Sequence, residues 1–185
     1  SKENMHYGGK KMAETIRELI SEQDVDKRIE ELGQEISRDY AGKSIHLICI
    51  LKGGAFFMCE LAKRITLPVS IDFMYVSSYG DATSSSGNIK IKKDLDESVE
   101  GKDVLIVEDI IDSGRTLFFL TRELEKRGAK SIRLCTLLDK PDRRVVEVRT
   151  DYVGFQIPDE FVVGYGLDYA QKYRTLPYIG VVEGV

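Results

Sequence analysis

The stretch that decides the fold is Val104–Thr116, which reads VLIVEDIIDSGRT. Its first residues are apolar, and a helical pattern follows from Thr116 to Arg127 and ends at Gly128, so we expect a buried strand, a turn and a helix. The same order occurs earlier, where the apolar run Ile45–Leu51 precedes two glycines and a helix-like segment at Ala55–Arg64. Strands that alternate with helices predict an α/β domain with a mainly parallel central sheet and helices on both faces.

Further segments extend this pattern on both sides. We expect a third strand of the central sheet at Ile132–Leu138. Alternating apolar and polar residues at Val69–Phe73 and Ile89–Ile91 predict a hairpin around a mobile, serine-rich loop at 78–87. Apolar spacings of three and four predict two amphipathic helices near the amino end, the first with Met12, Ile16 and Leu19 and the second with Val25, Ile29, Leu32 and Ile36.

Composition limits the classes of protein to which the chain can belong. Its 185 residues, 42% of them hydrophobic, fit one globular domain. A formal net charge of -4 argues against a nucleic-acid partner, and the longest apolar run falls far short of the roughly 20 residues that cross a bilayer, which argues against a membrane partner. With no leader sequence and three unpaired cysteines in apolar contexts, Cys49, Cys59 and Cys135, we expect a cytoplasmic protein with buried free thiols.

Two acidic residues follow the first apolar residues of the quoted stretch. Glu108 and Asp109 stand side by side at the carboxyl end of the expected strand, which is where parallel sheets bind ligands. Neighbouring carboxylates can accept hydrogen bonds from a vicinal diol and can help to hold a divalent cation.

The next residues open the expected helix. Free backbone N–H groups, two hydroxyls, a glycine and the positive end of a helix dipole form a phosphate cradle at Asp112, Ser113, Gly114, Arg115 and Thr116. A carboxylate pair that can bind a diol, next to a site that can bind a phosphate, fits a ribose 5-phosphate. The alternative interpretation is an acidic strand end followed by an ordinary helix cap.

Val104–Thr116 resembles the phosphoribosyl-pyrophosphate-binding motif of the type I phosphoribosyltransferases. Further motifs between about His46 and Val182 are similar to those of the hypoxanthine-guanine branch of that family. The resemblance implies that Glu108, Asp109 and the residues from Ser113 to Thr116 bind phosphoribosyl pyrophosphate. Many relatives have lysine at the position of Arg115, which leaves the role of this side chain open.

Two loops also match the family. Leu51-Lys52-Gly53-Gly54 resembles its pyrophosphate loop, which implies a cis peptide at Leu51-Lys52 and donor binding by Lys52 and Gly53; a plain glycine turn is the alternative. Ser78 and Tyr79, with the serine-rich stretch after them, resemble the lid that covers the reacting centre, where a surface loop would explain the composition equally well.

The carboxyl-terminal third resembles the purine pocket of the family. The resemblance implies that Lys140 donates to the exocyclic oxygen of the base, that Phe161 stacks on its ring and that Val162 contacts it through the backbone. By the same resemblance, Asp168 lies at the purine site and helps to bind a second magnesium ion, and Arg174 holds pyrophosphate. The alternatives are a surface lysine, a core phenylalanine and solvated surface charges.

The resemblance to this family implies the following fold and function. We expect a single domain over 1-185, with a core at about 40-165 and a small hood from about 1-20 and 150-185. The reaction transfers phosphoribosyl from its pyrophosphate to N9 of hypoxanthine or guanine with Mg2+, and Asp112 either exchanges a proton with N7 or stabilises charge. We also expect a homodimer or homotetramer. The alternatives are a regulator that senses phosphoribosyl pyrophosphate without turnover, and a relative that uses xanthine or a pyrimidine.

Overall fold

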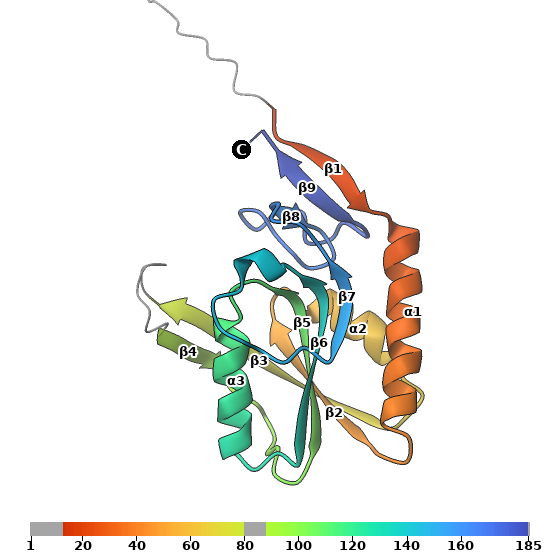
Figure 1. Cartoon of the computed structure of the whole chain (residues 1–185), viewed down its shortest axis with the longest axis vertical. Helices are drawn as coiled ribbons and strands as arrows, with labels where there is room; N and C mark the ends of the chain where they lie inside the picture. Colours follow the sequence, from red (N-terminus) through yellow and green to blue (C-terminus); the bar gives the residue numbers. More distant parts are fainter. Residues whose placement is uncertain (1–12, 80–87, 185) are drawn as a thin grey trace, which may run out of the picture.

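A six-stranded sheet forms the core of the computed structural model, which describes residues 13–79 and 88–184 (Figure 1). The strand order is β4-β3-β2-β5-β6-β7, and all neighbouring pairs are parallel except β3 with β4. The strands are β2 (Ile45–Leu51), β3 (Val69–Tyr79), β4 (Asn88–Lys93), β5 (Asp103–Ile111), β6 (Ser131–Asp139) and β7 (Tyr152–Gln156). The predicted α/β class and the predicted hairpin of β3 and β4 are confirmed. The predicted loop between them lies mostly at 80–87, outside the described residues.

Helices cover both faces of this sheet. Alternate residues of β2 pack into two different apolar clusters, because successive side chains of a strand point to opposite faces. The cluster with Leu47 includes buried side chains of α1 (Glu22–Asp39) and α2 (Ala55–Ala62), and the cluster with Ile48 includes those of α3 (Arg115–Lys126). Figure 1 shows α1 and α3 on opposite sides of the sheet.

A second, three-stranded antiparallel sheet lies beyond the end of β7 (Figure 1). It has the order β1-β9-β8 and comprises β1 (Thr15–Ile20), β9 (Ile179–Glu183) and β8 (Val162–Val163). Because β1 and β9 come from opposite ends of the described chain, this small sheet joins segments that are distant in sequence. We call the sheet, together with the chain that connects β8 to β9, the hood.

The first of the two predicted amphipathic helices is wrong. Ile16 and Leu19 lie in β1, whose residues pair antiparallel with β9 from Thr15↔Glu183 to Ile20↔Ile179, and Met12 lies outside the described residues. A spacing of three suits a helix, but the ladder with β9 decides the conformation instead. The second predicted helix is confirmed as α1, which begins after Ser21, whose hydroxyl accepts a hydrogen bond from the Asp24 backbone N–H at 3.1 Å.

Three further details differ from the expectations or add to them. β5 continues to Ile111, so that Glu108 and Asp109 lie within the strand rather than at its end, because pairing with β6 extends as far as Ile111↔Asp139. Cys49 and Cys135 are buried free thiols as expected, whereas Cys59 is exposed on α2. A short 3-10 helix, η1 (Pro141–Arg143), follows β6.

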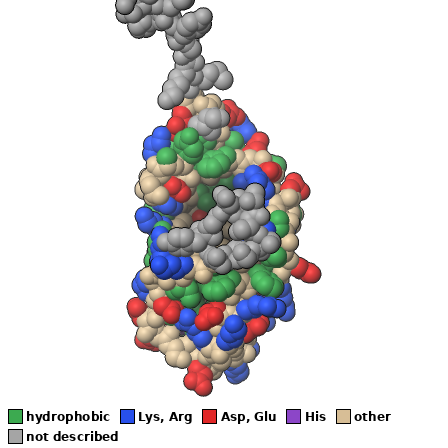
Figure 2. All heavy atoms as spheres, turned by 90° about the vertical axis from the view of Figure 1, so that its left-hand side faces the viewer, with side chains coloured by type: hydrophobic (Ala, Val, Ile, Leu, Met, Phe, Trp, Pro, Cys, Tyr) green, Lys and Arg blue, Asp and Glu red, His purple; other side chains and the backbone are tan. Residues whose placement is uncertain are grey.

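The surface and the helix lengths of the described residues bear on possible partners. Acidic and basic side chains are interspersed on the face shown in Figure 2, and neither sign forms a continuous patch among the described residues there. None of the helices described is both long enough and apolar enough to cross a membrane.

Candidate active site

A cleft of about 300 Å³ lies at the carboxyl end of β5. The last residues of β5, the loop after it and the first turn of α3 supply most of its lining, and β2 and β3 contribute one residue each, Ile50 and Val76. The cleft residues named by the sequence are Glu108, Asp109, Asp112, Ser113, Gly114 and Thr116. The structure therefore brings the carboxylate pair and the predicted phosphate cradle together in one cavity.

The two carboxylates of the pair are almost completely buried. Glu108 is 8% exposed and Asp109 is 9% exposed, and burial raises the pKa of both side chains. The charge of Asp109 raises the pKa of Glu108 further, and a hydrogen bond joins the two side chains. The charge of Arg174 acts in the opposite direction on Asp109 and lowers its pKa, but burial outweighs it. The site thus holds two adjacent buried carboxyl groups whose charged forms are disfavoured by burial.

The loop before α3 has the backbone that an anion site needs. Gly114 caps the helix with φ +85°, a conformation that L residues rarely adopt, and a Cβ at this position would meet Val148 Cγ2 at 2.9 Å. The Ser113 hydroxyl accepts a hydrogen bond from the Arg115 N–H at 3.3 Å. The next N–H groups of the first turn have no acceptor within the helix, so they and the helix dipole favour an anion at this point.

The glycine loop after β2 reaches the same carboxylates. The predicted cis peptide at Leu51-Lys52 is present. A Cβ on Gly53 would overlap the Asp109 carboxylate, so only glycine leaves room for this approach. A Cβ on Gly166 of the hood would overlap the Gly53 carbonyl, which places the pyrophosphate-loop candidate between β5 and the hood. The backbone of Ser78 and Tyr79 pairs with β4, and their side chains are not among those described.

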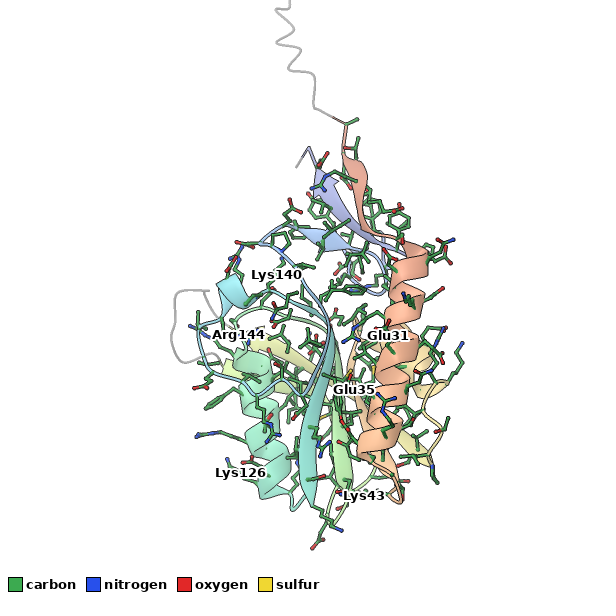
Figure 3. All side chains as sticks on the ribbon, turned by 45° about the vertical axis from the view of Figure 1, so that its right-hand side comes forward. Glu31, Glu35, Lys43, Lys126, Lys140 and Arg144 are labelled. Atoms are coloured by element: carbon green, nitrogen blue, oxygen red, sulfur yellow. The ribbon has the colours of Figure 1, made fainter. Side chains whose placement is uncertain are left out.

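Lys140 is buried rather than a surface lysine. It is 8% exposed, and its Nζ lies 4.0 Å from Asp112 Oδ1, whose side chain is 54% exposed. The Lys140 backbone N–H donates to the Ile111 carbonyl at 3.0 Å, which ties the end of β6 to the end of β5. Figure 3 shows Lys140 at the level between the core and the hood. A buried ammonium group and a solvent-accessible carboxylate therefore face one another beside the cleft.

Phe161 is exposed rather than part of the core. The residue is 51% exposed, and its ring makes an edge-to-face contact with that of Tyr169, with ring centroids 5.5 Å apart and planes at 86°. Val162 is buried at the start of β8, and the Val182 N–H donates to the Phe161 carbonyl at 3.0 Å. The hood thus presents an aromatic ring on a fixed backbone.

Asp168 and Arg174 form one interacting unit in the hood. Arg174 Nη2 lies 3.4 Å from Asp168 Oδ1, and Arg174 Nη1 donates to the Gly166 carbonyl at 2.6 Å. The positive charge of Arg174 lowers the pKa of Asp109, although burial raises it more. Arg174 therefore links the hood electrostatically to the carboxylate pair.

Two residues of the site neighbourhood were missed by the sequence reasoning. Asp139, 5% exposed, precedes Lys140 and forms a short ion pair with Arg144, whose Nε donates to the Asp112 backbone carbonyl at 3.2 Å. An acidic residue at the buried end of a strand, with arginine five residues later, is the signal that could have suggested this pair.

A larger cavity of about 580 Å³ lies elsewhere, and it shares no residue with the cleft. It opens between α1, α2 and the segment 175–177, with acidic and apolar side chains in its lining. Its lining includes the first residues of α1 and α2, but the carboxylates of Glu22, Asp26 and Glu60 disfavour an anion there, so it is a poorer candidate for a phosphate site.

Comparisons with known proteins agree with this geometry. Residues 16–170 match the family described as phosphoribosyl transferase domain. The hypoxanthine-guanine phosphoribosyltransferases of Bacillus subtilis and Streptococcus thermophilus are 54% and 52% identical over 165 residues, which cover 89% of this chain and 92% of each relative. The crystal structure of a hypoxanthine phosphoribosyltransferase from Staphylococcus aureus superimposes with a TM-score of 0.87 at 51% identity, covering 90% of this chain and 91% of that one.

Other relatives are much longer. The bifunctional protein TilS/HprT of Listeria monocytogenes is 56% identical over 165 residues, and the match covers 89% of this chain but only 26% of that protein. The chain therefore spans about a quarter of the length of these relatives.

Proposed function

The chain belongs to the phosphoribosyl transferase family, and on this premise we propose that it is a purine salvage enzyme. It transfers the 5-phosphoribosyl group from phosphoribosyl pyrophosphate to N9 of hypoxanthine or guanine, giving IMP or GMP and pyrophosphate. The observation that carries this proposal is the cleft in which a buried carboxylate pair lies beside the helix N-terminus at Gly114. A diol and a phosphate on one sugar match those two features.

Glu108 and Asp109 are proposed to accept hydrogen bonds from the ribose hydroxyls and to bind the Mg2+ that accompanies the donor. Two adjacent buried carboxyl groups fit Mg2+, which prefers oxygen ligands. When bound, the ion offsets negative charge on the donor and on departing pyrophosphate. Asp168 is the candidate for a second ion. The described residues contain no group of three or more metal-ligating side chains, so donor oxygens or water would complete either coordination shell.

The phosphates of the donor occupy two separate places in this proposal. The 5-phosphate binds at Ser113, Gly114, Arg115 and Thr116, where the first-turn N–H groups point out of the helix. Pyrophosphate binds at Lys52, Gly53 and Arg174, and Ser78 and Tyr79 cover the donor.

The base binds between the core and the hood. Lys140 donates to the exocyclic oxygen and therefore favours 6-oxopurines over adenine, whose amino group is itself a donor. The exposed face of Phe161 stacks on the ring, and Val162 contacts the base through its backbone.

Asp112 is the proposed catalytic residue. Its carboxylate is accessible at the cleft and faces the Lys140 ammonium, so it can exchange a proton with N7 of the purine or stabilise the charge that develops there.

The arrangement of the whole molecule follows the same proposal. A core at about 40-165 holds the donor, and a hood from about 1-20 and 150-185 covers the base. Free thiols at all three cysteines support a reducing cytoplasmic setting, and exposed Phe56 and Ile71 provide apolar surface for a homodimer or homotetramer.

The test is multiple turnover by the purified chain. We expect the chain with phosphoribosyl pyrophosphate and Mg2+ to form nucleotide from hypoxanthine and guanine and much less from adenine. Binding of the donor without nucleotide formation on any base would contradict the proposal and would indicate a sensor. Preference for xanthine would identify the other branch of the family.

A further inference from the structure

The segment after Lys140 wraps around the loop that carries Asp112. Val145 and Val146 donate their backbone N–H groups to the Ser113 carbonyl at 3.0 and 3.3 Å. Arg144 Cδ would lie 3.0 Å from a Cβ on Gly114, so the stem of this arginine packs against the cap of α3. Residues 144–146, which belong to neither β5 nor α3, therefore contact the loop at both Ser113 and Gly114.

Arg144 makes the only side-chain contact among those described between this segment and the Asp112 backbone. Its Nε donates to the Asp112 carbonyl at 3.2 Å, and its Nη2 forms a short ion pair with Asp139. Asp139 is 5% exposed and lies on β6, which pairs with β5 at Ile111↔Asp139. The guanidinium thus joins a strand end to the backbone of a half-exposed loop residue.

Building on the function proposed above, we infer that Arg144 is a positioning residue for Asp112 and that Asp139 is its anchor. The fork fixes the Asp112 backbone relative to Lys140, which follows Asp139 directly and is itself bonded to Ile111. The carboxylate of Asp112 and the ammonium of Lys140 consequently keep one relative position while the base binds between core and hood.

The planar fork of arginine is essential to this role. A guanidinium can donate to two acceptors in fixed directions at once, whereas a lysine ammonium on a flexible stem acts as a point charge. Lysine at position 144 can neutralise the buried Asp139 carboxylate, but it does not hold the Asp112 carbonyl in the same direction. The Arg144→Lys variant therefore separates the structural ion pair from the positioning contact.

The neighbouring arginine supplies a matched control. Arg143 pairs with Asp159 at 2.8 Å on the surface, with side-chain exposures of 60% and 43%. It interacts with Asp112 through its charge, which lysine retains. We expect Arg144→Lys to melt within a few degrees of the parent and to lose about tenfold to a hundredfold in kcat, the scale of a catalytic group displaced by about 1 Å. KM for phosphoribosyl pyrophosphate should change little. Arg143→Lys should retain the kcat of the parent.

A double-mutant cycle distinguishes positioning from general loosening of the fold. In the Asp112→Asn background the group that Arg144 positions is already disabled, so Arg144→Lys should lower kcat by less than about twofold more. A full additional loss in that background would overturn the inference, as would a kcat equal to that of the parent for Arg144→Lys alone.

Hydrogen exchange gives a readout that does not need turnover. Exchange at the Val145 and Val146 amides, which bond to Ser113, should accelerate in Arg144→Lys and stay unchanged in Arg143→Lys. Unchanged exchange in Arg144→Lys would contradict the positioning role of Arg144, whether or not the chain is an enzyme. If exchange accelerates in Arg144→Lys but the parent protein forms no nucleotide, only the proposed enzymatic function is contradicted.

Discussion

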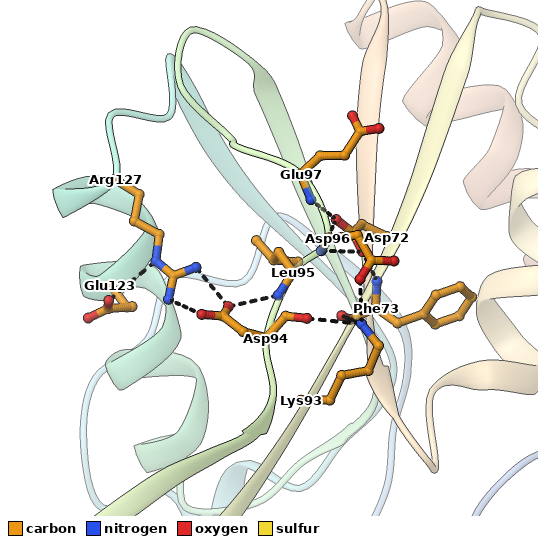
Figure 4. Close-up of polar contacts among 9 residues, drawn as sticks. All are labelled: Asp72, Phe73, Lys93, Asp94, Leu95, Asp96, Glu97, Glu123 and Arg127. Carbon is orange, nitrogen blue, oxygen red and sulfur yellow. Dashed lines mark hydrogen bonds and ion pairs between the residues drawn. The ribbon is translucent and has the colours of Figure 1, made fainter.

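Buried carboxylates occur in two regions of the core sheet, and their surroundings are opposite. Asp72, 3% exposed on β3, accepts backbone hydrogen bonds from Phe73 at 2.8 Å, from Asp96 at 3.0 Å and from Glu97 at 3.0 Å (Figure 4). Glu108 and Asp109 are buried to a similar degree on β5, and each accepts only one backbone N–H, from Asp109 at 3.2 Å and from Ile110 at 2.7 Å among the hydrogen bonds of the described residues, so burial dominates there.

The two regions differ in the sign of their pKa shifts. Burial alone would raise the pKa of Asp72, but the three N–H donors outweigh it and lower that pKa below its usual value. Burial raises the pKa of both Glu108 and Asp109. A carboxylate whose charged form the chain favours serves the fold, whereas a buried pair whose charged forms it disfavours is available to a cationic ligand.

The network around Asp72 extends to α3. Lys93 Nζ donates to the carbonyls of Phe73 and Asp94, at 3.2 and 2.9 Å, and Arg127 binds Asp94 through two hydrogen bonds of 2.7 and 2.9 Å. The segment after β4 is thereby fixed to both β3 and the carboxyl end of α3 (Figure 4). Substitutions here should affect stability, and substitutions at the cleft should affect activity.

The largest expected effect is that of Asp112→Asn. The change keeps the shape of the side chain and removes its charge and proton affinity, so kcat should fall by roughly tenfold to ten-thousandfold. Because the Asp112 side chain is 54% exposed, the melting temperature should stay close to that of the parent. Steady-state kinetics with hypoxanthine measures the fall in kcat, and a thermal melt measures the stability. A kcat equal to that of the parent would contradict the catalytic role of Asp112.

The second effect is that of Lys140→Gln on the choice of base. Loss of a charge-assisted hydrogen bond should weaken transition-state binding of hypoxanthine by about 1.5 to 3 kcal/mol and lower kcat/KM for this base accordingly. The difference in kcat/KM between hypoxanthine and adenine should therefore become smaller. Phe161→Leu, which removes only stacking, should cost about 0.5 to 1.5 kcal/mol. If Lys140→Gln left the ratio of hypoxanthine to adenine unchanged, the assignment of the base pocket would fail.

The third effect concerns the fold alone. Asp72→Asn should lower the free energy of unfolding by about 1 to 3 kcal/mol at pH 7, because backbone donors lose a charged acceptor. Since the folded-state pKa of Asp72 lies below its unfolded value, the stability it contributes is present above about pH 4 and is lost as the pH falls through the folded-state pKa. Urea unfolding between pH 3 and 7 should therefore show a smaller loss of stability toward acid for the variant, while kcat at pH 7 stays unchanged.

The contrast between the two regions also explains what the sequence could predict. The cleft is local: Glu108, Asp109 and Gly114 lie within one strand, one turn and one helix start, so their spacing alone predicts their meeting. The hood is not local, because β1 pairs with a strand near the other end of the chain, and the spacing of Ile16 and Leu19 gives no sign of that partner. The Asp139–Arg144 pair and the donors to Asp72 likewise depend on how irregular segments fold back on the sheet.

The most direct test of the central claim, that burial disfavours the charged forms of the β5 carboxylates until a ligand binds, is the thermal stability of Glu108→Gln at pH 8 with and without phosphoribosyl pyrophosphate and Mg2+. Because the folded-state pKa of Glu108 is raised, its contribution to stability is greatest below the unfolded pKa and is lost as the pH rises. Glutamine avoids this loss and can still accept the Asp109 N–H, which bonds to Glu108 Oε1 at 3.2 Å.

We expect the ligand-free variant to melt at or above the temperature of the parent, with a gain of about 1 kcal/mol for each pKa unit removed, and to lose most of the stabilisation that the donor and Mg2+ give the parent. A ligand-free variant that melts well below the parent and retains the full stabilisation by ligand would contradict the account.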